Sequence, residues 1–134
     1  MRLVAALAAV ALLLPGSATA VAKERKTPEA KLADLLEGRV AGEPVDCIPL
    51  HQIRSTRIID RTAIVWEAGS TVYVNRPAGA QSLDQWDVLV TKPFGSRLCS
   101  IDSVRLVDSG TRMTSGFVHL GAFVPYKKIR TAAN

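Results

Sequence analysis

The chain has 134 residues, of which 48% are hydrophobic and 22% charged, and a net charge of +5. This composition is ordinary for a globular protein, and the chain shows no internal repeat and no low-complexity segment. Its length allows one core of ordinary size and is too short for two comfortable domains.

The first 20 residues predict a helical secretory signal peptide. Met1-Arg2 is followed by an apolar run to Leu14, and Pro15-Gly16 then leads into small residues. This order is that of a cleavable signal, and the run is too short to span a bilayer. The cleavage residues are Ala18 and Ala20, or Ala20 and Ala22, so we expect the cut after Ala20 or Ala22.

We expect four regions, namely a signal at 1–20, a polar segment with a short helix at 21–46, a β domain at 47–126 and a basic tail at 127–134. Thr27-Pro28-Glu29 favours a helix start, because Thr27 can cap and Pro28 suits the first turn. Leu32, Leu35 and Leu36 share one face, and Gly38 is placed to end the helix.

From Cys47 onward the apolar residues recur with a period of two, which indicates β strands. Two alternating runs meet at Ala68-Gly69-Ser70 and predict a hairpin with strands around Trp66 and Val74. Further strands are expected at 57–60, 87–92, 103–107 and 121–126, with a loop at 77–85. The expected fold is mostly β, a small antiparallel sheet or partly open barrel with one short N-terminal helix.

Cys47 and Cys99 are the only cysteines. In an oxidising compartment they are expected to form a structural disulfide, and the alternatives are two free buried thiols or exchange with an oxidoreductase. A redox catalyst is disfavoured, since there is no Cys-x-x-Cys motif.

No residue pattern predicts a catalytic, cofactor or metal site. His51 follows Cys47 by four residues, but one sulfur with His51 and His119 does not supply a zinc site. We expect His119 to be a strand residue that faces solvent. Asp84 and Asp87 flank Trp86 and could be an acid/base pair at a sugar site, although a polar loop leading into a strand is the commoner explanation.

Trp66, Tyr73 and Trp86 could form an aromatic platform, but we expect the core to take most of them. Several arginines flank strands, where charges protect sheet edges. If they converge on one face they could bind an anion, and the candidates are Arg54, Arg57, Arg76 and Arg105.

The order of motifs in 47–126 resembles an uncharacterised family, a domain of unknown function, of small exported proteins of Gram-negative bacteria. The motifs are Cys47-Ile48-x-Leu50-x-x-Ile53-x-Ser55-Thr56, Ile58-Ile59-Asp60, Thr71-Val72-Tyr73-Val74-Asn75-Arg76, Leu98-Cys99-Ser100-x-Asp102-x-Val104-Arg105 and Leu120-Gly121-x-Phe123-x-Pro125-Tyr126. The resemblance implies a periplasmic β domain with Cys47 paired to Cys99, and it implies no activity. Many members carry a second cysteine pair where this chain has Ala80 and Val118, so the 77–85 loop is expected to be mobile.

The leading functional hypothesis is a periplasmic or secreted, non-enzymatic protein that binds another envelope protein or stabilises an assembly. The alternative is a module for an anionic envelope ligand, motivated by the net charge and the arginines. The third is a small hydrolase that uses Asp84, Asp87 or His119. No cofactor, no nucleic acid and no membrane span after cleavage are expected.

Overall fold

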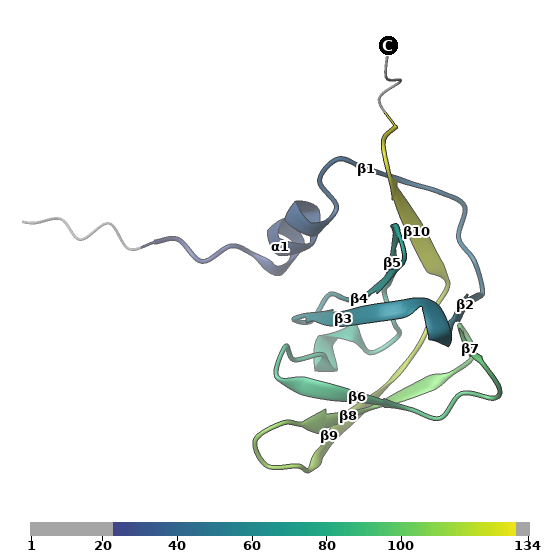
Figure 1. Cartoon of the computed structure of the whole chain (residues 1–134). Helices are drawn as coiled ribbons and strands as arrows, with labels where there is room; N and C mark the ends of the chain where they lie inside the picture. The colour runs from purple at the N-terminus through teal and green to yellow at the C-terminus, as the bar shows by residue number, and fades with distance from the viewer. Residues whose placement is uncertain (1–22, 131–134) are drawn as a thin grey trace, which may run out of the picture.

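The computed structural model describes residues 23–130. The predicted signal with its cleavage residues Ala18, Ala20 and Ala22 lies outside the described residues, as does the end of the predicted tail. The described part has one α-helix and ten strands, and the strands form three antiparallel sheets (Figure 1). The elements are α1 Pro28–Leu35, β1 Arg39–Ala41, β2 Cys47–Pro49, β3 Ile53–Ile59, β4 Ala63–Ala68, β5 Thr71–Asn75, β6 Asp87–Thr91, β7 Arg97–Cys99, β8 Ser103–Asp108, β9 Thr114–His119 and β10 Phe123–Lys128.

The predicted fold class is confirmed, because the described chain is mostly β with one short N-terminal helix. The predicted hairpin is β4 and β5, which pair directly across a turn where Gly69 has a φ of 61°. Such a positive φ favours glycine. β3 is longer than the predicted strand at 57–60, since it begins at Ile53.

The largest sheet has the strand order β1-β10-β5-β4-β3, and its two faces bury different apolar clusters. Successive side chains of a strand point to opposite faces. Ile64 and Trp66 of β4 therefore lie in the cluster shared with the smaller sheets, whereas Val65 lies in the cluster beneath α1.

A three-stranded sheet of order β6-β8-β9 and the β2-β7 pair cover the first of these faces. The chain passes from β9 to β10 through Leu120–Ala122 and so joins the small sheet to the large one (Figure 1). The buried Asn75 holds this junction, because its side chain donates to Gly121 O at 2.6 Å and accepts from Gly121 N at 3.0 Å. At the opposite side the sheets do not close on each other, and β3 and β6 each end a sheet.

Helix α1 covers the second face and begins as predicted. The Thr27 side chain accepts a hydrogen bond from Ala30 N at 3.2 Å, which satisfies a free N–H of the first turn. Leu32 is buried, and Leu35 and Leu36 pack against the same cluster. Gly38 has a φ of 71° just beyond the helix. No helix among residues 23–130 is long and apolar enough to cross a membrane.

Two predicted region boundaries differ from the observed elements. The 21–46 segment holds a strand in addition to the helix, because β1 pairs with the end of β10. β10 itself runs through Lys128, two residues into the predicted tail.

The 77–85 loop has no second disulfide, and backbone hydrogen bonds and one buried leucine attach it to the rest of the domain. Ala78 pairs with His119, Leu83 is buried, and Arg61 N donates to Leu83 O at 3.0 Å.

Candidate functional site

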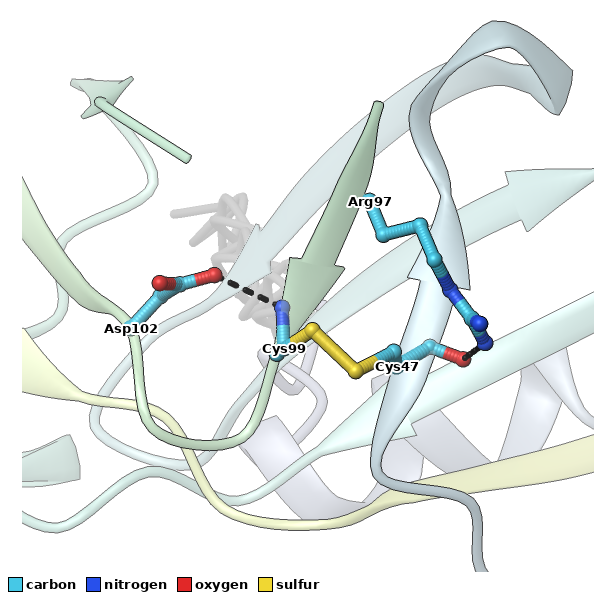
Figure 2. The surroundings of a disulfide bond; sticks show 4 residues. All are labelled: Cys47, Arg97, Cys99 and Asp102. Atoms are coloured by element: carbon cyan, nitrogen blue, oxygen red, sulfur yellow. Dashed lines mark hydrogen bonds between the residues drawn. A yellow bond between two sulfur atoms is a disulfide. The ribbon is translucent and has the colours of Figure 1, made fainter. Parts of the chain in front are cut away.

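Cys47 and Cys99 form a disulfide and lie directly opposite each other in the β2-β7 pair (Figure 2). Cys99 N donates to Asp102 Oδ2 at 2.7 Å, and Arg97 reaches Cys47 O at 3.5 Å. The neighbouring Ile48 and Leu98 are part of the buried core. The disulfide therefore links two core segments 52 residues apart in sequence, and it is compatible with an oxidising, extracellular compartment.

A groove of about 950 Å³ runs along β3, between α1 and β6. A volume of this size is within the range of ligand sites. Six of its residues are exposed, so the groove is open to solvent. Its lining is Lys31, Asp34, Leu35, Leu50, Ile53, Thr56, Arg57, Ile58, Ile59, Trp66, Gln85, Asp87, Val88, Leu89, Thr91 and Leu98.

The alternation of β3 divides this groove into two halves. Arg57 lies opposite Val65, on the sheet face that α1 covers. Ile58 lies opposite Ile64, on the face that the small sheets cover. One half of the groove is therefore flanked by α1, and the other is apolar and bounded by β6, where Leu89 packs against the core.

The charged groups of the groove are unequally paired. Asp34 forms an ion pair with Lys26 and accepts a hydrogen bond from its Nζ, and this hydrogen bond raises the pKa of Lys26. Asp87 Oδ1 accepts from Ser115 Oγ at 2.9 Å. Lys31 and Arg57, in contrast, form no ion pair within residues 23–130. The half of the groove beside α1 therefore carries a surplus of positive charge.

The four candidate anion-binding arginines do not lie together. Arg54 and Arg57 are both exposed on β3. Arg76 binds both carboxylate oxygens of Glu29 at 2.8 and 3.0 Å, which ties α1 to the end of β5 and lowers the pKa of Glu29. Arg105 is exposed on β8, between the buried Val104 and Leu106, and so faces away from the core. Of the four, only Arg57 lines the groove.

The carboxylates Asp84 and Asp87 lie in different places. Asp84 Oδ1 accepts from Trp86 N at 2.8 Å and lines a separate hollow of about 260 Å³ with Asp60 and Arg61. Asp87 lines the groove. The two side chains therefore do not face one shared pocket, as an acid/base pair acting on one bond would have to.

The three aromatic residues also separate. Trp66 is buried and meets Phe123 edge to face, with ring centroids 5.4 Å apart. Tyr73 lies opposite Trp66 on β5 and packs against the same core, whereas Trp86 is 67% exposed. The core thus takes two of the three rings, as expected.

His119 lies on β9 and is exposed, as predicted, and His51 is exposed in a 3₁₀ turn at Leu50–Gln52. The sequence did not indicate that Ser103 Oγ would lie 2.8 Å from His119 Nδ1 across the β8-β9 pair. Neither residue lines the groove. Within residues 23–130, no three His, Cys, Asp or Glu side chains are close enough to hold a metal ion together.

Comparison with known proteins found no matching family model, no matching curated protein and no matching solved structure.

Proposed function

We propose that this chain is an exported, non-enzymatic binding module that holds a segment of another envelope protein in the groove along β3. The observation that carries the proposal is the groove itself, an open concavity of about 950 Å³ with a partly apolar lining. The Cys47–Cys99 disulfide supports export to the periplasm or beyond, because such bonds persist in oxidising compartments.

Site-specific photo-crosslinking in the native host tests this function. A photoreactive residue is placed at Thr56 or Gln85, which are exposed and line the groove, and at Thr114, which is exposed on β9 outside it. We expect the two groove positions to give one adduct of defined mass and Thr114 to give none. Adducts from all three positions, or from none, would contradict the proposal.

A second candidate is a module for an anionic envelope component, supported by Arg54 and Arg57 on one strand with Lys31 nearby in the groove. Binding of purified lipopolysaccharide or anionic lipid should then weaken steeply with salt. It should also be lost in Arg57→Glu and retained in Arg105→Glu. Salt-insensitive binding, or equal loss in both variants, would remove this candidate.

A further inference from the structure

The floor of the groove is an unpaired strand edge. β3 ends its sheet, so only one side of its backbone pairs with β4. Within residues 23–130, the backbone of residues 54–58 forms no hydrogen bond to a main-chain segment other than β4, and the Ile53 N–H donates to Leu50 O. Seven residues of strand extend about 23 Å at about 3.3 Å per residue. An added strand can satisfy such a row of N–H and C=O groups, which an acyl chain or a sugar cannot do along its length.

The opposite wall is also a terminal strand, because β6 ends the three-stranded sheet. Its Asp87 Oδ2 is buried and has no hydrogen-bond partner in the described chain. Leu89 of β6 lines the apolar half of the groove. Leu50, in the turn just before β3, and Ile53, at the start of β3, line it as well. A guest strand beside β3 would therefore bond to the β3 backbone along one edge and lay one of its two faces against this apolar wall.

The two halves of the groove fix which side chains a guest strand should carry. Alternate side chains of an added strand point to the same two faces as those of β3. One set meets the α1 side, where Lys31 and Arg57 form no ion pair within residues 23–130, and the other meets the apolar side. Acidic residues fit the first set, and apolar residues fit the second, where the Asp87 carboxylate disfavours further negative charge.

Resting on the function proposed above, we infer that the groove binds an extended polypeptide segment with alternating acidic and apolar residues, which adds as a strand to β3. Charge complementarity favours this occupant over residues 23–26 of the same chain. That stretch carries Lys23, Arg25 and Lys26 against a single acid, Glu24, and would place like charges beside Lys31 and Arg57.

The test uses the purified full chain and a pool of fluorescent nine-residue peptides in which glutamate alternates with leucine or valine. Anisotropy measures binding of this pool, of the same pool with lysine for glutamate, and of two pools that are N-methylated on alternate sets of amides. Only one set of amides of an added strand faces β3. We therefore expect one methylated pool to bind at least about tenfold more weakly than the other, and the lysine pool to bind least.

Two charge-reversal variants test whether the peptides bind in the groove and whether its positive charge contributes to binding. Arg57→Glu should weaken binding of the glutamate pool about tenfold, while Arg105→Glu makes the same charge change on the outer face of β8 and should leave binding unchanged. Equal binding of both methylated pools, preference for the lysine pool, or no binding would overturn strand addition. Displacement of the peptides by decanoate but not by excess unlabelled peptide, or a shift to dimers, would also overturn it.

The two proposals can fail separately. Groove crosslinks to a partner together with equal binding of the methylated pools would leave the binding function in place and reject strand addition. Absence of groove crosslinks would reject the function itself.

Discussion

The two faces of the five-stranded sheet are covered in different ways. One face is buried against the two smaller sheets in a cluster of ten buried residues, and the Cys47–Cys99 disulfide links β2 to β7 beside it. The other is covered by α1, a helix of eight residues that buries one leucine fully. A helix this short is not stable alone. The groove therefore has β6, which packs against the larger cluster, on one side and α1, which packs against the smaller cluster, on the other.

The largest effect should come from removing the disulfide between β2 and β7. In the chain-entropy model, a disulfide that closes a loop of this length stabilises the fold by about 4 kcal/mol. Cys47→Ser should therefore lower the melting temperature by about 15 °C or more, measured by circular dichroism. Wild type in reducing agent should melt at nearly the same temperature as the variant. A variant that melts like the oxidised wild type would contradict the central place given to this bond.

Replacing one buried leucine on each face of the five-stranded sheet tests whether the two faces contribute differently to stability. Leu106 and Leu32 are both buried, and replacing a buried leucine by alanine costs about 2–5 kcal/mol. Leu106→Ala should destabilise the whole domain. Leu32→Ala should release α1 first, because Leu32 is the one residue that the helix buries, whereas the sheet beneath it is also held by its strand pairing. Hydrogen exchange resolved by residue should show uniform loss of protection in the first variant and loss confined to Pro28–Leu35 in the second. Uniform loss in both would show that the two faces unfold together.

A smaller effect is expected at the start of α1. Thr27→Ala removes the acceptor for Ala30 N and should cost about 1 kcal/mol, seen as faster amide exchange in the first turn. Thr27→Ser keeps an acceptor and is the matched control. Equal behaviour of the two variants would mean that the side-chain cap contributes nothing to this helix.

The smallest effect is an ion pair that depends on pH. The hydrogen bonds from Arg76 lower the pKa of Glu29, so the folded state favours the ionised carboxylate. This stabilisation is present above the ordinary glutamate pKa and is lost as the pH falls through the lowered value. Glu29→Gln should therefore reduce the melting temperature slightly at neutral pH and not at strongly acidic pH.

Glu43→Gln is the control for this pH series, since Glu43 is exposed and forms no ion pair in the described chain. A pH dependence that is the same in the two variants would remove the role assigned to Arg76.

The elements that sequence reasoning found are those with a local signal. Thr27-Pro28-Glu29 marks the helix start, and the alternation around Gly69 marks the β4-β5 hairpin. The sequence predicts a strand residue at His119 but not the extent of β9, because Ser115-Gly116 breaks its alternating pattern. β2 and β7 are not predicted, because three residues are too few to show a period. β2 and β7 form only because these two distant segments of the chain pair with each other.

The groove could not be predicted, although several of its residues had been singled out. The sequence indicates Arg57 as an anion ligand, Asp87 as an acid/base group and Trp66 as part of an aromatic platform. What brings them to one groove is that β3 and β6 both end a sheet and lie on either side of it. Strand order depends on pairings between distant segments, and no local pattern of side chains encodes it.

The most direct test of the account is hydrogen exchange at the amides of β3, measured with and without the glutamate-containing peptide pool. Without peptide, the amides of residues 54–58 that do not pair with β4 should exchange rapidly, because no other backbone oxygen in the described chain accepts a hydrogen bond from them. With peptide, the account predicts that this same set becomes protected while the amides of β8 and β9 do not change. Unchanged exchange along β3 under conditions where the peptides bind would contradict it.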